Sequence, residues 1–188
     1  MRPGPPGRVL SGMNSNAPTQ ATTFTATATA PRLVVRQAAV LGAGVMGAQI
    51  AAHLVNAGVR VLLFDLPSKE SDASAIARKG VAGLMRLEPA PLGHPDLAAS
   101  IAVANYADDL ARLRDCDLVI EAIAERLDWK RDLYAKIGAS IAPHAIVASN
   151  TSGLSIAALD DAMPAALRPR FCGIHFFNPP RYMVLVEL

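Results

Sequence analysis

The stretch AAVLGAGVMGAQIAAHLVNAGVRVLLFD, residues 38–65, decides the fold that the sequence predicts. It begins with a short apolar run, residues 38–42, of the kind that forms buried strands. A helical stretch of small and apolar residues follows and is stopped by Gly58, since glycine commonly ends helices. A second apolar run, residues 59–65, predicts another strand. Strand, turn, helix and strand in this order indicate two parallel strands joined by a helix.

The rest of the chain repeats this alternation. Further apolar runs predict strands at residues 117–123, 145–150, 171–177 and 183–188, and helical stretches occupy residues 68–87 and 125–141. Residues 88–96 are rich in proline and predict a surface loop. The strands are rich in Val, Ile and Leu rather than strictly alternating, which is typical of a parallel sheet covered on both faces. We therefore predict a doubly wound α/β fold with a mainly parallel sheet and helices on both faces.

The composition limits the classes of function. A chain of 188 residues, 52% hydrophobic and 18% charged, has the composition of one globular domain. Its formal net charge of +2 gives no reason to expect a nucleic acid or an anionic membrane as partner, and no run suggests a membrane span of about 20 apolar residues. Neither Cys116 nor Cys172 stands at metal-ligand spacing, so no metal site is expected. Two cysteines without a disulfide framework fit a reducing compartment, and we expect the protein in the cytoplasm.

The first residues differ from the rest in composition. Residues 1–31 are rich in Pro, Gly, Ser, Thr and Ala without hydrophobic periodicity, which predicts a disordered tail before an ordered domain of residues 32–188. The tail contains Arg2 and Arg8 but no acid, and so resembles an organelle transit peptide, although its prolines argue against the amphipathic helix of such peptides. A start at Met13 is an equally open alternative.

The glycine turn GAGVMG matches the pattern G-x-G-x-x-G between the first predicted strand and its helix. In a phosphate-binding turn, Gly42 permits the tight bend, Gly44 lets a pyrophosphate approach the backbone, and Gly47 lets the helix pack on the strand. Val45 and Met46 complete the turn at the start of the helix, where free N–H groups favour a bound phosphate.

Asp65 ends the second predicted strand, where a carboxylate can accept hydrogen bonds from the hydroxyls of an adenosine ribose. The same carboxylate repels the 2′-phosphate of NADP, and no arginine directly follows it. The turn and this acid together predict a Rossmann-type domain that binds NAD. The alternative is a glycine-rich turn without a ligand, beside a solvated aspartate.

Polar side chains follow three of the other predicted strands. Glu121 and Glu125 lie in VIEAIAER, Asn150 and Ser152 in SNTSG, and His175 and Asn178 in HFFNPP. Because ligands bind beyond the carboxyl ends of strands in an open parallel sheet, we expect these side chains near a nicotinamide ring. A single histidine among apolar residues is more often a hydrogen-bonded core residue than a catalyst. A hydroxyl, an amide and a carboxylate facing the same place favour a catalytic site.

Four motifs carry a resemblance to a known family. GAGVMGAQIAAHLVNAG, DLVIEAIAE, SNTSGLSI and HFFNPP together resemble the NAD-binding domain of L-3-hydroxyacyl-CoA dehydrogenases of fatty-acid β-oxidation, over residues 35–188. The sequence is especially similar to bacterial forms in which this domain begins a longer protein with an enoyl-CoA hydratase-like module. The resemblance implies an oxidoreductase that uses NAD to oxidise L-3-hydroxyacyl-CoA to 3-ketoacyl-CoA.

The resemblance also implies roles for individual residues. His175 is the expected acid/base and Glu187 its paired carboxylate, while Ser152 and Asn178 are expected to bind the reacting oxygen. Asn150 and Glu121 match family positions near the nicotinamide and its ribose. A carboxylate against one imidazole nitrogen fixes the tautomer and raises the basicity of the other nitrogen, which suits a histidine that takes a proton from the C3 hydroxyl.

In the family, an all-helical domain follows, completes the acyl-CoA pocket and forms the subunit interface. The resemblance therefore implies that the chain is a truncated dehydrogenase with little activity alone, and that the full-length enzyme is a homo-oligomer. Two alternatives stay open: an NAD-dependent dehydrogenase of another 3-hydroxy acid or sugar acid, and a non-catalytic NAD-binding fragment.

Overall fold

The structure of the chain is a computed structural model that describes residues 33–188. The disordered tail predicted for residues 1–31 lies outside the described residues, and so does Arg32. The helices, strands and contacts of the domain therefore all belong to residues 33–188.

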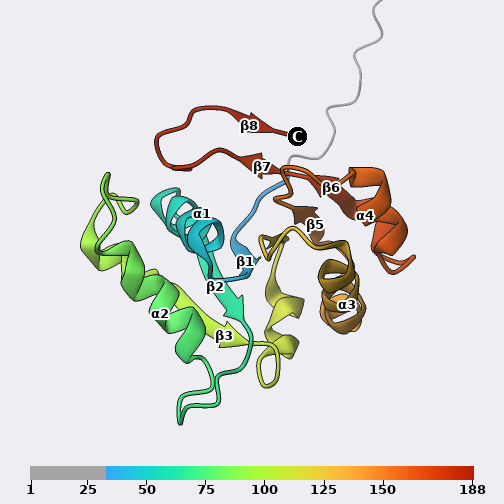
Figure 1. The fold of residues 1–188 in the computed structure, drawn as a ribbon, viewed down its shortest axis with the longest axis horizontal. Coiled ribbons are helices and arrows are strands. Elements are labelled where there is room, and N and C mark those ends of the chain that lie inside the picture. Colours follow the sequence, from blue (N-terminus) through green and yellow to red (C-terminus); the bar gives the residue numbers. More distant parts are fainter. Residues whose placement is uncertain (1–32) are drawn as a thin grey trace, which may run out of the picture. The chain divides into compact units, whose positions relative to one another are not determined.

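The centre of the domain is a six-stranded parallel sheet with the strand order β3-β2-β1-β4-β5-β6 (Figure 1). The strands are β1 (Gln37–Leu41), β2 (Arg60–Asp65), β3 (Ile101–Asn105), β4 (Leu118–Glu121), β5 (Ile146–Ser149) and β6 (Phe171–Gly173). Each neighbouring pair runs parallel. The chain order reverses at β1, which lies between β2 and β4, and a sheet of this kind binds ligands beyond the carboxyl ends of its strands at that point.

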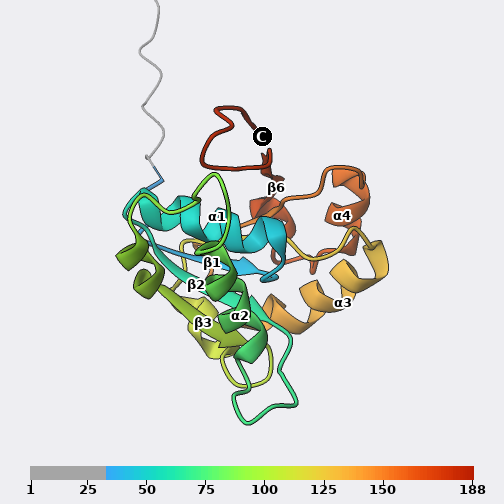
Figure 2. The same ribbon diagram turned by 60° about the vertical axis from the view of Figure 1, so that its left-hand side comes forward.

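Helices cover the sheet on both faces (Figures 1 and 2). The α-helices are α1 (Val45–Asn56), α2 (Ala75–Leu84), α3 (Leu127–Ile137) and α4 (Ile156–Ala162), and the 3-10 helices are η1 (Pro95–Ser100), η2 (Leu110–Asp115), η3 (Gly138–Ser140) and η4 (Arg168–Arg170). Alternate residues of β1 enter two separate cores: Val40 packs with α1 and α2, and Leu41 with α3 and α4. Because a strand buried on both faces has no polar side, its sequence is a continuous apolar run, as predicted. The doubly wound, Rossmann-type fold is thus confirmed.

Two elements, the edge strand β3 and the helix α4, were not predicted. Three predicted elements differ in extent, and the first is the helix predicted for residues 68–87, which is the shorter α2. The strand predicted for residues 171–177 is divided at Ile174 into β6 and the separate β7 (His175–Phe176). The run 183–188 forms only β8 (Val186–Glu187), which pairs antiparallel with β7 and makes a two-stranded ribbon outside the main sheet.

Three further features concern membrane spans, metal sites and the two cysteines. None of the helices in residues 33–188 combines the length and apolarity that crossing a membrane requires. The same residues contain no group of three or more His, Cys, Asp or Glu side chains arranged to hold a metal ion. Both cysteines are free thiols, and burial raises the pKa of Cys116 to about 11. Cys116 is therefore protonated at neutral pH and suited to packing rather than to reaction.

Candidate functional site

The glycine turn joins β1 to α1 in a conformation that two of its glycines make possible. Gly42 has a φ of +105°, which favours glycine, and a Cβ there would lie 2.9 Å from the carbonyl oxygen of Ala122. A Cβ on Gly47 would lie 1.8 Å from the carbonyl oxygen of Gly42, so any side chain would push α1 away from the turn. A Cβ on Gly44 would meet no described atom within 4 Å, so the backbone at Gly44 is open to a ligand. The packing roles predicted for Gly42 and Gly47 agree with this geometry.

The other two residues of the turn differ in burial. Val45, the first residue of α1, is 69% exposed, whereas Met46 is partly buried against the core on the α1 side of the sheet. No acidic side chain lies in the first turn of α1. The start of this twelve-residue helix therefore presents backbone N–H groups and its positive dipole end without a competing negative charge from that turn.

Asp65 is held against the glycine turn from the end of β2. One carboxylate oxygen, Oδ2, accepts a hydrogen bond of 2.6 Å from the backbone N–H of Ala43. The other, Oδ1, accepts one of 2.7 Å from the backbone N–H of Leu66. The carboxylate is thus fixed in place by backbone donors on both sides and remains partly exposed to a ligand.

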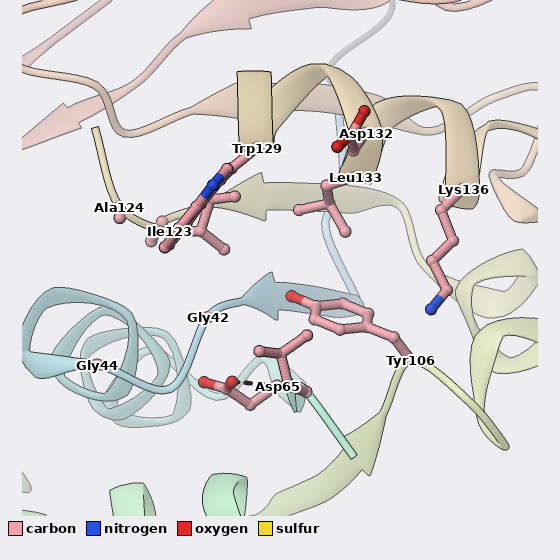
Figure 3. Close-up of a pocket in the computed structure, with 12 residues that line it drawn as sticks. Gly42, Gly44, Asp65, Tyr106, Ile123, Ala124, Trp129, Asp132, Leu133 and Lys136 are labelled. Atoms are coloured by element: carbon pink, nitrogen blue, oxygen red, sulfur yellow. Dashed lines mark hydrogen bonds between the residues drawn. The ribbon is translucent and has the colours of Figure 1, made fainter. Parts of the chain in front are cut away.

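A cavity of about 520 Å³ opens beside the turn and Asp65 (Figure 3). Its walls are mainly apolar, and its lining residues come from the turn, the end of β2, the end of β3, the segment after β4 and α3: Gly42, Gly44, Asp65, Leu66, Tyr106, Ala122, Ile123, Ala124, Trp129, Asp132, Leu133 and Lys136. An apolar slot with one fixed carboxylate and an open glycine backbone suits the adenosine and phosphate groups of a dinucleotide.

Most residues that line the cavity were not predicted from the sequence, and Tyr106 and Lys136 are two of them. Tyr106 directly follows β3, the strand that was not predicted, and Lys136 lies in the last turn of α3. The Tyr106 ring stacks on Phe64 of β2, with ring centroids 5.8 Å apart, and the Lys136 ammonium lies 5.9 Å from the Tyr106 ring centroid. Burial and the nearby charge of Asp65 raise the pKa of Tyr106 far above its usual range, so this hydroxyl keeps its proton.

Glu121 was expected near the nicotinamide and its ribose, but it is buried in the interior of the domain. Its side chain is fully buried, and it accepts hydrogen bonds of 2.6 and 2.8 Å from the Lys130 ammonium, 2.9 Å from the Tyr134 hydroxyl and 2.6 Å from the Ser149 hydroxyl. The Ile123 N–H adds a bond of 2.8 Å. With every contact turned inward, this carboxylate is not exposed to a nicotinamide or its ribose. Its role is to neutralise a buried lysine and to join β4, β5 and α3.

Glu125 is the glutamate of this segment that reaches the loop after β5. Its carboxylate accepts hydrogen bonds from the Thr151 hydroxyl, the Ser152 N–H and hydroxyl, and the Gly153 N–H. The Lys130 ammonium lies 3.7 Å away. Burial alone would raise the pKa of Glu125, but the hydrogen bonds from Ser152 and Thr151 and the Lys130 charge outweigh it and lower this pKa. Ser152, which was expected to be catalytic, is therefore hydrogen-bonded to the ionised carboxylate of Glu125.

His175 and Glu187 face each other across the β7–β8 ribbon. They are directly paired in register, and the His175 Nδ1 lies 2.8 Å from a Glu187 carboxylate oxygen. The His175 side chain is 24% exposed and that of Glu187 is 59% exposed. A carboxylate at Nδ1 orients the ring and leaves Nε2 as the nitrogen that can exchange a proton with a ligand.

The two asparagines connect this ribbon to the rest of the domain. The Asn150 carboxamide oxygen accepts a hydrogen bond of 2.9 Å from the Phe176 N–H and so joins the end of β5 to β7. The Asn178 carboxamide oxygen accepts one of 3.1 Å from the Gln49 side chain on α1. Within residues 33–188, the four expected catalytic residues thus form three hydrogen-bonded pairs, His175–Glu187, Ser152–Glu125 and Asn178–Gln49, and no hydrogen bond joins one pair to another.

Comparison with known proteins gives a consistent picture. Residues 37–188 match the family described as "3-hydroxyacyl-CoA dehydrogenase, NAD binding domain". A probable 3-hydroxyacyl-CoA dehydrogenase of Deinococcus radiodurans is 46% identical over 156 residues, which cover 82% of this chain and 45% of that protein. A putative fatty acid oxidation complex trifunctional enzyme of Rickettsia felis is 43% identical over 155 residues, which cover 82% of this chain and 22% of that protein. The chain therefore spans less than half of the length of either relative.

Solved structures agree in fold. The 3-hydroxybutyryl-CoA dehydrogenase of Escherichia coli K12 matches with a TM-score of 0.66 and 31% identity, over 82% of this chain and 32% of that chain. The (S)-3-hydroxybutyryl-CoA dehydrogenase of Ralstonia eutropha matches with a TM-score of 0.64 and 31% identity, over 81% of this chain and 53% of that chain. The family resemblance, the Rossmann-type fold and NAD as the cofactor are all confirmed.

Proposed function

We propose, from the premise that this chain belongs to the family of NAD-binding domains of 3-hydroxyacyl-CoA dehydrogenases, that it serves the oxidation of L-3-hydroxyacyl-CoA to 3-ketoacyl-CoA. One observation carries the proposal. The His175 Nδ1 and a Glu187 carboxylate oxygen lie 2.8 Å apart, in a domain that also contains a glycine turn suited to binding a dinucleotide. This pairing provides a base for the substrate hydroxyl in the domain that binds the hydride acceptor.

The residues of the cofactor site fit NAD. The open backbone at Gly44 and the start of α1 suit the pyrophosphate, and the fixed carboxylate of Asp65 suits an unphosphorylated adenosine ribose. NAD bound by these residues would supply the hydride acceptor for the oxidation at C3 of the substrate. The protein contributes position: backbone donors for the phosphates, a carboxylate for the ribose and an apolar slot for the base.

We assign the proton transfer to His175. Its Nε2 takes the proton of the C3 hydroxyl, while Glu187 at Nδ1 keeps the neutral ring in the required tautomer and stabilises the imidazolium that forms. The Asn178 carboxamide oxygen already accepts from Gln49, so its amide nitrogen is the group left to donate to the substrate oxygen. The Ser152 hydroxyl donates to Glu125 and has to exchange that acceptor before it can donate to the substrate oxygen.

The first experiment is a binding titration that uses Trp129 as the reporter. Trp129 is the only tryptophan of the chain and lines the cofactor cavity, so bound NADH is expected to quench its emission by energy transfer to the nicotinamide. We expect saturable quenching with NADH and much weaker quenching with NADPH. A folded chain that shows no saturable response to either would contradict the cofactor assignment.

The second experiment tests the substrate class. The chain spans less than half of the length of the Deinococcus and Rickettsia relatives, so turnover is best measured on a protein with the length of those two relatives. We expect NAD reduction with L-3-hydroxyacyl-CoA thioesters, none with free 3-hydroxy acids or sugar acids, and loss of this activity in His175→Gln. Reduction driven by the free acids instead would replace the proposed substrate.

We also propose that the protein acts in the cytoplasm and that its full-length form is a homo-oligomer. The bacterial relatives and the two free thiols support the first proposal. Fractionation followed by immunodetection tests the compartment, and light scattering of the longer protein tests the oligomer. Recovery in the membrane fraction, or a monomer at all concentrations, would contradict the respective proposal.

A further inference from the structure

The connection between β7 and β8 is fastened to a distant part of the chain, the proline-rich loop of residues 88–93. The connection covers residues 177–185 and lies beside α1 (Figures 1 and 2). Among the strands of the described chain, β8 pairs with β7 alone, and residues 181–188 are all exposed. A ribbon of two short strands is only marginally stable by itself. The position of Glu187 on β8 therefore depends on how the connection is held.

Arg181 is the main anchor of the connection. Its Nη1 donates a hydrogen bond of 2.8 Å to the carbonyl oxygen of Ala90 and another to that of Leu92. The Tyr182 hydroxyl donates one of 2.8 Å to the same Ala90 oxygen, and the Arg181 guanidinium carbon lies 5.4 Å from the Tyr182 ring centroid, within the range of a cation–π contact. Hydrogen bonds from a charged donor are stronger than those between neutral groups, so Arg181 can hold an exposed segment in place.

The loop that accepts these bonds is itself fixed to the domain. Asn56, the last residue of α1, donates a hydrogen bond of 2.8 Å from its amide nitrogen to the carbonyl oxygen of Pro91. Its carboxamide oxygen accepts one of 2.7 Å from the Gly93 N–H. The Leu92 side chain is buried in the core on the α1 side of the sheet. The two carbonyl oxygens that bind Arg181 are therefore held by the frame of the domain and not by a mobile surface.

We propose that Arg181 is a positioning residue for the acid/base pair. By fastening the connection to the proline-rich loop, it sets the position of β8 and so keeps the Glu187 carboxylate at Nδ1 of His175. A misplacement of about 1 Å can lower a catalytic rate by about 10²-fold, so a loosened ribbon would lower turnover. The inference rests on the proposed function and gives a role to the proline-rich loop, which neither the cofactor site nor the catalytic residues explain.

The kinetic test uses Arg181→Ala in a protein with the length of the Deinococcus relative. With an L-3-hydroxyacyl-CoA as substrate, we expect kcat to fall about tenfold and the KM for NAD to stay within about twofold, because the cofactor residues lie elsewhere. Arg181→Lys should keep most of kcat, since an ammonium can donate to the same two carbonyls. Arg86→Ala removes an exposed arginine two residues before the loop and is the control for lost positive charge, with kcat unchanged.

A double variant tests whether the loop acts through Arg181. Asn56→Ala frees the loop from α1 and should also lower kcat. If the loop and Arg181 form one connection, Asn56→Ala/Arg181→Ala will be no slower than Arg181→Ala, because the connection is already broken. Losses that multiply in the double variant would show that the two residues act separately, and the proposed role of the loop would be overturned.

A spectroscopic test uses the 188-residue chain and does not depend on turnover. The 15N chemical shifts of the His175 imidazole report which ring nitrogen carries the proton. We expect the Nδ1–H tautomer in the native chain and in Arg181→Lys, because Glu187 accepts from Nδ1. In Arg181→Ala we expect a shift toward the Nε2–H tautomer, which prevails in free histidine. The native tautomer at native proportion in Arg181→Ala would overturn the inference.

Other kinetic outcomes would also overturn it. These are an unchanged kcat in Arg181→Ala, and a fall in kcat that is accompanied by lower NADH affinity and a lower melting temperature, which would make Arg181 a residue of the fold. A raised KM for the acyl-CoA at constant kcat would mean that Arg181 contacts the substrate. Absence of turnover by the native longer protein contradicts the proposed function instead, and the tautomer of His175 then still tests the role of Arg181.

Discussion

Two carboxylates of this domain, Glu121 and Glu187, were both expected at the catalytic end of the sheet, but they occupy opposite environments. Glu121 ends β4, has no exposed surface and accepts hydrogen bonds from a lysine, a tyrosine, a serine and a backbone N–H. Glu187 lies on β8, is 59% exposed and contacts His175 alone among the hydrogen-bond partners in residues 33–188. The first belongs to the packing of the sheet and the second to a surface ribbon of two short strands.

The difference in burial between Glu121 and Glu187 implies different effects on the free energy of unfolding. A buried ion pair that loses one partner leaves an uncompensated charge in a low-dielectric interior. An exposed pair contributes little to folding because water and salt screen it. The β4 end therefore supports the position of the glycine turn and the loop after β5, whereas the proposed acid/base pair of the β7–β8 ribbon is exposed and contributes little to the stability of the fold. Substitutions can test this division directly.

The largest effect is expected at Lys130, which is 1% exposed and bound to Glu121. Lys130→Met leaves the Glu121 carboxylate buried without a counter-charge, and we expect a loss of about 3–5 kcal/mol in the free energy of unfolding. Urea unfolding followed by circular dichroism measures it. The double variant Glu121→Gln/Lys130→Met is expected to recover a large part of the loss because no charge remains buried. A loss below about 1 kcal/mol in the single variant would show that Glu121 does not depend on Lys130 for its burial.

A smaller effect, on binding rather than folding, is expected at Asp65. Asp65→Ala removes the proposed acceptor for the ribose hydroxyls and also the negative charge that would oppose a 2′-phosphate. We expect at least tenfold weaker NADH binding, since hydrogen bonds to charged groups contribute about 1.5–3 kcal/mol, together with a reduced preference for NADH over NADPH. Fluorescence titrations with both dinucleotides measure the two affinities. Asp65→Asn is the matched control that keeps the shape and removes the charge; an unchanged preference in both variants would refute this role.

A modest pH-dependent effect is expected at Glu125. Its folded-state pKa is lowered from the ordinary value of about 4.5, so its contribution to stability is present above that value and is lost as the pH falls through the lower folded pKa. The side chain is 41% exposed, and solvent screening keeps the contribution below about 1 kcal/mol. Glu125→Gln should therefore be less stable than the native chain at pH 7 and equally stable at a pH below the folded pKa. Urea midpoints at the two pH values measure this, and an equal difference at both would contradict it.

The smallest effect on folding is expected at Glu187. Glu187→Gln should change the free energy of unfolding by less than about 0.5 kcal/mol, because the pair is exposed and the ribbon is short. NADH affinity should also stay within about twofold. Thermal melts and the Trp129 titration check both values. A loss as large as that of Lys130→Met would mean that the β7–β8 ribbon is part of the stabilising core, and Glu187 would then resemble Glu121 in its contribution to folding.

The sequence predicted best those elements whose structure depends on residues close together in the chain. The glycine turn, the helix after it and Asp65 are all local features, and the predicted βαβ unit is present with small shifts at its ends. Edge strand β3 was missed because IAVAN is short and small-chained, and an edge strand pairs on one side only. The break at Ile174 was missed because an apolar run does not indicate which strand its residues will pair with.

The site was predicted only in part, because some of its contacts join residues that are far apart in the chain. The pairing of His175 with Glu187 followed from the family resemblance, and the structure places the two side chains in contact. The burial of Glu121 depends on Lys130, which comes from the facing side of α3, and a strand pattern does not reveal such a partner. The apolar surroundings of Glu121 in VIEAI were nevertheless a usable signal, because a carboxylate within a buried strand needs a counter-charge.

The position of β1 between β2 and β4 also has a kinetic consequence. The backbone N–H of Gln37 bonds to the side chain of Asp117, 80 positions later, and the glycine turn packs against Ala122. Closing a loop of this length precedes most of the stabilising contacts of the sheet, and folding rates fall as such distant contacts increase. During synthesis, the phosphate-binding turn therefore cannot reach its final shape until β4 has left the ribosome. We expect a slow-folding domain in which the ability to bind dinucleotide appears late and in a single step.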